Sequence, residues 1–74
     1  MQLLKTMVAV FKTNVLHEDE AHLLRQVIGS QAGITRCDFD LEDCDKILRI
    51  ECRESIADKV IGLLARNGFM CEEL

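Results

Sequence analysis

The sequence contains no proline, no tryptophan and no tyrosine. Without proline it lacks the usual marker of a linker between domains, and 74 residues are enough for one small domain spanning residues 1–74. Long apolar runs are also missing. The apolar core near the amino terminus, residues 7–11, is shorter than the roughly 7–15 residues of a secretory signal or the about 20 of a membrane helix. We therefore expect a cytoplasmic protein that does not insert into a membrane.

Clustered positive charge is absent as well. The nine Lys and Arg residues are scattered, and the net charge is −4. Binding to nucleic acid depends on Lys and Arg at the phosphates, so this composition argues against it. A surplus of acidic residues is in most proteins simply a soluble surface.

The four cysteines contain no C-x-x-C pair, and in a reducing compartment we expect them to be free thiols. Cys37 and Cys52 fall at apolar positions of alternating segments, which is typical of small buried side chains. Cys44 lies in a polar turn and should be exposed, where it could oxidise or bind a metal. Cys71 is close to the carboxyl terminus of the sequence.

Short apolar or alternating segments predict four strands, at residues 6–12, 34–41, 46–52 and 69–74. The polar turn at residues 42–45 joins the second and third of these into a hairpin. Apolar residues at helical spacing predict two helices between the strands. Their stripes are Leu23, Leu24, Val27 and Ile28 in the first helix, and Ile56, Val60, Leu63 and Leu64 in the second.

The first helix is preceded by an acidic stretch. Glu18, Asp19 and Glu20 fall in its first turn, where carboxylates favour the positive end of the helix dipole. Either Asn14 or His17 is expected near its cap. Gly68 is suited to the left-handed position that follows the second helix.

The order strand, helix, strand, strand, helix, strand predicts an α+β fold of the ferredoxin-like βαββαβ type. Two short amphipathic helices need a sheet to cover their apolar faces, so both should pack on one face of a four-stranded antiparallel sheet. The other face of the sheet would remain open to solvent or to a partner.

The alternation of the first strand leaves two possible orientations. If Val8 and Val10 face the helices, then Ala9, Phe11 and Ile47 lie on the open face, with Met70 as a further candidate. An exposed apolar patch of this kind tends to mark an association surface. We therefore expect a homodimer or a protein partner through the open face of the sheet, although scattered apolar residues are also common on small domains.

From Met7 onward the chain resembles the heavy-metal-associated domains, which include copper chaperones, modules of copper-transporting ATPases and small mercury-binding proteins. The G-M-x-C-x-x-C loop of that family falls on residues 14–20. Its Gly-Val before the second strand falls on Gly33 and Ile34, and its Gly-Phe before the last strand falls on Gly68 and Phe69. The resemblance implies the same fold, and it implies that the segment after Gly68, including Cys71, lies beside the first loop.

The resemblance also marks where the family's metal chemistry is missing. The two metal-binding cysteines are replaced by His17 and Glu20, and the preceding Gly and Met by Asn14 and Val15. Cu(I) prefers thiolates, so capture of Cu(I) of the family's kind is not expected. Imidazole and carboxylate suit Zn(II), Ni(II) or Cu(II), and a third ligand would have to come from Asp19, His22 or a partner chain.

No catalytic arrangement is visible. Neither histidine has a thiol partner in sequence for a nucleophile pair, and no glycine-rich phosphate loop is present. We therefore expect a non-catalytic module for protein interaction or regulation, without a cofactor. The alternative is a metal-handling domain that uses His17 and Glu20 with a divalent transition metal. A third hypothesis, a ligand-binding regulatory domain of the ACT type, shares the strand and helix order, but the Gly68-Phe69 match favours the metal family.

Overall fold

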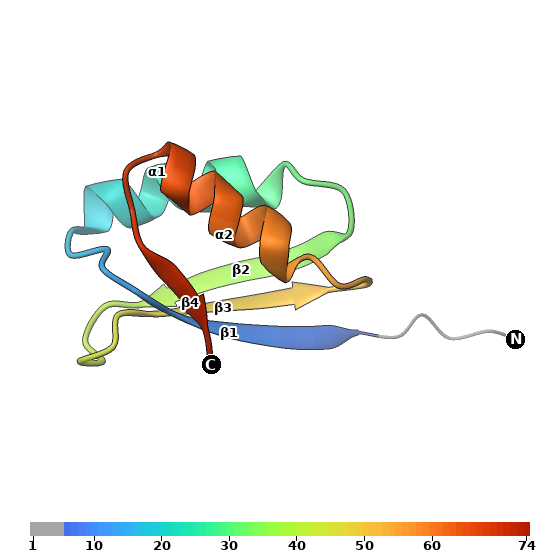
Figure 1. Cartoon of the computed structure of the whole chain (residues 1–74), viewed down its shortest axis with the longest axis horizontal. Coiled ribbons are helices and arrows are strands. Elements are labelled where there is room, and N and C mark those ends of the chain that lie inside the picture. The colour runs from blue at the N-terminus through green and yellow to red at the C-terminus, as the bar shows by residue number, and fades with distance from the viewer. Residues whose placement is uncertain (1–5) are drawn as a thin grey trace, which may run out of the picture.

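A computed structural model describes residues 6–74 and has the expected α+β order (Figure 1). The elements are β1 (Met7–Thr13), α1 (Glu18–Gly29), β2 (Ile34–Asp40), β3 (Ile47–Cys52), α2 (Ala57–Arg66) and β4 (Cys71–Glu73). The strands form one antiparallel sheet in the order β2-β3-β1-β4, and both helices lie on the same face of it (Figure 1). This is the ferredoxin-like fold that the sequence predicts. Within residues 6–74, neither helix has the length and apolar character needed to cross a bilayer.

The core lies between the helices and the sheet. From the sheet it takes Phe11, Leu48 and Ile50, which are all fully buried. From the helices and loops it takes Val15, Ala21, Leu24, Ile28, Ile56, Val60, Leu63 and Leu64. Burial of these side chains is the main favourable term for so small a chain, because each large aliphatic or aromatic residue contributes about 1.5–3 kcal/mol.

The orientation of β1 is the reverse of the one on which the predicted open-face patch depends. Phe11 is fully buried and Ala9 packs against the core, so both face the helices. Val8 is 59% exposed and lies on the open face, as does Val10. The patch of Ala9, Phe11 and Ile47 is therefore wrong for its first two members. The physical reason is size, since the larger aromatic side chain gains more from the core than a valine does.

The apolar stripe of α1 is also narrower than predicted. Leu24 and Ile28 are buried, but Leu23 is 62% and Val27 is 37% exposed. In α2 the predicted stripe of Val60, Leu63 and Leu64 is buried. Residues at positions i and i+4 of a helix share a face, whereas the neighbours Leu23 and Leu24 point about 100° apart. The core side of α1 is centred on Ala21, Leu24 and Ile28, so Leu23 and Val27 lie on its margin.

Candidate binding surface at the first loop

The first loop, residues 14–17, leaves the end of β1 and enters α1 at the same end of the molecule as the β2–β3 hairpin turn (Figure 1). Thr13 joins the two. Its hydroxyl donates to the Lys46 carbonyl oxygen (2.6 Å) and accepts from the Val15 backbone N–H (3.2 Å). Its backbone N–H also donates to the Asp45 carbonyl oxygen (3.1 Å). Thr13 is 7% exposed, so these bonds are shielded from competing water and hold the loop to the hairpin turn.

A second attachment ties the loop to the segment before β4. The side-chain oxygen Oδ1 of Asn14 accepts a hydrogen bond from the Met70 backbone N–H at 2.8 Å. The next residue, Val15, is fully buried in the core. The segment after Gly68 therefore does lie beside the first loop, as the resemblance implies. Cys71, which follows Met70, pairs with Thr13 across the β1–β4 register.

His17 is the N-cap residue of α1, which decides between the two predicted candidates. Its backbone N–H donates to the Glu20 carboxylate oxygen Oε1 at 3.3 Å, the reciprocal bond of a capping box. Its carbonyl oxygen accepts from the Ala21 N–H at 3.0 Å, which opens the helix. Glu20 thus satisfies an N–H group at the helix start, and its carboxylate also favours the positive end of the helix dipole.

Apolar side chains that are exposed, or half-buried in the case of Phe69, lie on this loop, on α1 and on the segment before β4. We call them the loop-end patch, which consists of Leu16, Leu23, Val27, Phe69 and Met70. Leu16 and Leu23 are each 62% exposed, and Met70 is 73% exposed. A groove of about 200 Å³ runs through the patch between α1 and the segment after α2. It is lined by Glu20, Leu23, Leu24, Val27, Asn67 and Phe69. Exposed apolar residues that gather around a groove are typical of a contact surface.

As a metal site, His17 and Glu20 are incomplete in the part of the chain that the structure describes. Both lie in the same turn, but no group of three His, Cys, Asp or Glu ligands includes either of them. The third ligands predicted from sequence, Asp19 and His22, do not join them. Glu20 would also exchange its bond to the His17 N–H for the metal.

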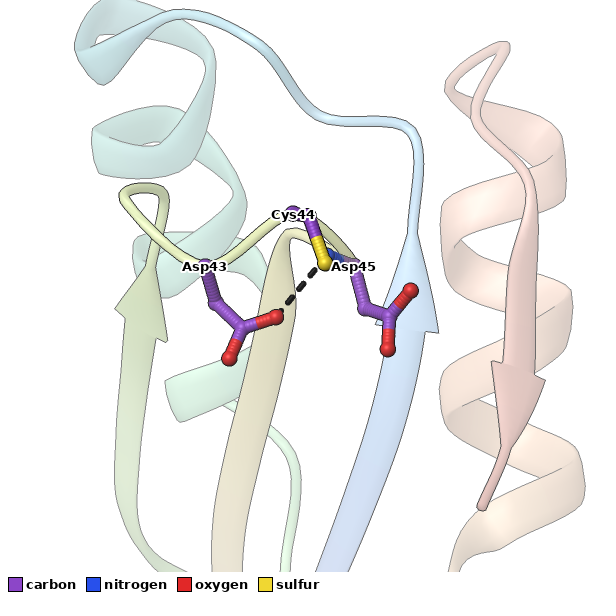
Figure 2. A group of neighbouring side chains, drawn as sticks. All are labelled: Asp43, Cys44 and Asp45. Carbon is purple, nitrogen blue, oxygen red and sulfur yellow. Dashed lines mark hydrogen bonds between the residues drawn. The ribbon is translucent and has the colours of Figure 1, made fainter.

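The one three-ligand group found among residues 6–74 is Asp43, Cys44 and Asp45 in the hairpin turn (Figure 2). Asp43 is committed to the turn itself, since its Oδ1 accepts from the Asp45 N–H (2.8 Å) and its carbonyl from the Lys46 N–H (3.0 Å). Asp45 lies 3.8 Å from the Lys12 ammonium. Cys44 is exposed, as the sequence predicts. The sequence predicts only a polar turn for the two flanking aspartates, and not their grouping with Cys44. These contacts describe a tight surface turn.

All four cysteines are free thiols. Cys52 is buried, and Cys37 and Cys71 are partly buried, as the alternation of their strands predicts for the first two. Burial raises the pKa of both Cys37 and Cys71 to about 11, to which nearby Asp38 and Glu73 respectively add. Without a metal, both thiols therefore stay protonated near neutral pH and are poor nucleophiles.

Comparison of the sequence with models of protein families, and with curated proteins, gives no match. Solved structures do match. The oxidized MerP of Ralstonia metallidurans CH34 is 12% identical with a TM-score of 0.76, over 93% of this chain and 97% of MerP. The yeast copper transporter domain Ccc2a, solved in apo and Cu(I) states, is 19% identical with a TM-score of 0.78, over 90% of this chain and 93% of that one.

The HMA domain of a copper chaperone for superoxide dismutase, in its apo form, is 16% identical with a TM-score of 0.76, over 95% of this chain and 68% of that one. At these identities the likeness concerns the fold. The chain therefore has the fold of the heavy-metal-associated domains, which is the fold that the resemblance in its sequence implies. The Cu(I) binding named for Ccc2a is a property of that protein, and the likeness of fold does not transfer it to this chain.

Proposed function

We propose that this chain is a non-catalytic protein-interaction module that docks through the loop-end patch. One observation carries the proposal. Two apolar residues of α1, Leu23 and Val27, are exposed outside the core, although a domain of this size buries only a small apolar area. Leu16 and Met70 extend the same surface from the two segments tied together by Asn14. A surface built from three separate segments is more than a single stray leucine.

The first loop, which contributes Leu16 to the patch, is held in place before any partner binds. Thr13, Asn14 and Val15 attach it to the hairpin turn, to the segment before β4 and to the core. A partner that binds such a surface loses less free energy to the ordering of loop residues. Glu20 lines the groove, and Glu18 and Asp19 precede it in the first turn of α1, which favours a partner with basic residues at the matching positions.

A photo-cross-linking amino acid placed at Leu23 in the cells that make the protein tests this proposal. We expect one defined partner to be captured from position 23, and none from a matched position, Arg49, on the open face of the sheet. The purified partner should then bind the wild-type chain at least about tenfold more tightly than a Leu23→Asp variant, because such a change removes a central apolar contact. Equal capture from both positions would remove the proposal.

A second candidate function is the binding of a divalent transition metal through His17 and Glu20. It is favoured by the exposed imidazole of His17 at the start of α1, three residues before a carboxylate in the same turn. Titration with Zn(II), Ni(II), Cu(II) and Cu(I), followed by NMR, tests it. Shifts at residues 17–22 at sub-micromolar metal, lost in His17→Ala, would support a site. Unshifted signals at millimolar metal would exclude one.

Homodimerisation through the open face of the sheet has less to support it once Ala9 and Phe11 are placed in the core. The apolar residues that the paired strands place on that face are Val8, Val10 and Ile47. A charged residue lies opposite each of them in the β1–β3 register, for example Glu51 opposite Val8. Sedimentation at several concentrations decides the matter, because a monomer at high concentration contradicts the dimer. The free thiols agree with the cytoplasmic location that we propose.

A further inference from the structure

Among residues 6–74, no strand lies on the outer side of β4, which therefore leaves a row of backbone groups unpaired. It stands at the edge of the sheet beside β1, with Lys12 opposite Glu72 and the Leu74 N–H donating to the Val10 carbonyl (2.9 Å). In an antiparallel pair, alternate residues direct their N–H and C=O groups to the same neighbour. The backbone groups of Cys71 and Glu73 therefore point away from β1 and are available to a further strand.

An open groove of about 620 Å³ lies beside this strand. Its α2 side is formed by Ile61 and Ala65, and Cys71 contributes from β4. The other lining residues are Lys12, Thr13, Asn14, Phe69, Met70 and Glu72. A strand added along β4 would direct alternate side chains toward the helix layer, where Ile61, Ala65 and the protonated thiol of Cys71 offer an apolar lining.

The charge of the edge selects between occupants. Glu72 and Glu73 are both exposed, and neither forms an ion pair with any residue from 6 to 74. Pairing of β4 with the β4 of a second copy would set these carboxylates against each other, and like charges directly opposite destabilise a strand pair. Acidic side chains on a short edge strand thus oppose self-pairing. On the open face, where the side chain of Glu72 lies opposite Lys12, the edge attracts a strand with basic residues beside Glu72.

We propose that the β4 edge binds an extended segment of a partner protein in which apolar and basic residues alternate. The segment adds as a fifth strand, with main-chain bonds to Cys71 and Glu73, apolar side chains on the helix side in the groove, and basic side chains on the open face beside Glu72. The site deepens the proposed role in protein interaction, on which it rests, but it uses a surface other than the α1 side of the loop-end patch. Each surface can therefore fail on its own.

NMR titration of the full chain with a blocked peptide Lys-Val-Lys-Val-Lys-Val-Lys tests the proposal. We expect shifts at Ile61, Ala65 and the β4 amides, together with slower hydrogen exchange of the Cys71 and Glu73 N–H groups. The peptide Glu-Val-Glu-Val-Glu-Val-Glu should not bind. The peptide Lys-Val-Lys-Pro-Lys-Val-Lys should bind far more weakly, because proline lacks the N–H that a strand pair needs.

Two variants separate this site from general charge attraction. Glu72→Lys should weaken the Lys-Val peptide by about tenfold or more, while Glu18→Lys, an equal change of net charge, should leave it nearly unchanged. Ala65→Asp, at an exposed position, should also abolish binding without loss of folding. Equal losses from both charge variants, or shifts confined to α1, would overturn the fifth-strand site. The latter result would leave the loop-end patch standing.

Discussion

The two helices cover the same sheet but use their apolar residues differently. In α2 the large apolar residues Val60, Leu63 and Leu64 are buried, and Ile61 is half-buried. In α1 the buried residues are Ala21, Leu24 and Ile28, while Leu23 and Val27 stand in solvent. The comparison teaches that α2 buries its leucines and its valine in the core, whereas α1 packs one side on the core and leaves a leucine and a valine exposed on another.

The largest effect should come from the core side of the comparison. Leu64→Ala in α2 removes a fully buried side chain and should lower the free energy of unfolding by about 2–5 kcal/mol. Chemical denaturation followed by circular dichroism measures it. Leu23→Ala in α1 is the matched control, and it should change the same quantity by less than about 0.5 kcal/mol. Similar losses from the two variants would erase the distinction between the helices.

Thr13→Val should have the next largest effect. It keeps the shape of the side chain but leaves the Lys46 carbonyl and the Val15 N–H without their shared partner. Unsatisfied buried groups cost about 1–3 kcal/mol, so the free energy of unfolding should fall by that amount. Thr13→Ser keeps the hydroxyl and should recover most of it. A fully stable Thr13→Val chain would show that this clamp does not hold the first loop.

Glu20→Ala should produce a smaller loss. It removes the acceptor of the His17 N–H and a first-turn carboxylate, which together are worth about 0.5–1 kcal/mol. Glu18→Ala, a control that removes a first-turn charge without a recorded hydrogen bond, should cost less. If Glu20→Ala instead raises the free energy of unfolding and abolishes a measured metal affinity, the carboxylate is a metal ligand that destabilises the helix. That result would support the metal hypothesis.

Leu23→Asp should have the smallest effect on folding and the largest on binding. The side chain is 62% exposed, so the free energy of unfolding should stay within about 0.5 kcal/mol of wild type. Leu24→Asp, one residue further on and 3% exposed, should prevent folding or nearly so. Thermal unfolding of the two variants gives this contrast without knowledge of the partner.

The fold could be predicted because its signals are local and periodic. The alternation of residues 34–41 and 46–52 and the spacing of Val60 and Leu64 each identify an element, and their order leaves few topologies. The orientation of β1 could not be obtained in this way, because Val8, Ala9, Val10 and Phe11 are all apolar. An uninterrupted apolar run carries no alternation, so only the packed structure shows that Phe11 enters the core.

The candidate site was harder to predict for a related reason. Sequence alignment with the family loop placed His17 and Glu20 at the helix start, and the structure finds them there as the N-cap residue and its capping partner. The patch depends instead on contacts between distant residues, such as that of Asn14 with Met70, which lie 56 positions apart. Helical spacing predicts Leu23 and Val27 in the apolar stripe, but it does not tell how wide a face of the helix packs against the core. For this reason the exposure of these two residues could not be predicted.

Cross-linking from position 23 compared with position 49 tests the central claim most directly. The account predicts that a single partner protein is captured from Leu23 in α1, and that Leu23→Asp abolishes binding of the purified partner. The chains that carry the cross-linker at position 23 or at position 49 should both unfold at the temperature of the wild type. The account would be contradicted if position 23 captured nothing while position 49 captured a partner protein or a second copy of this chain.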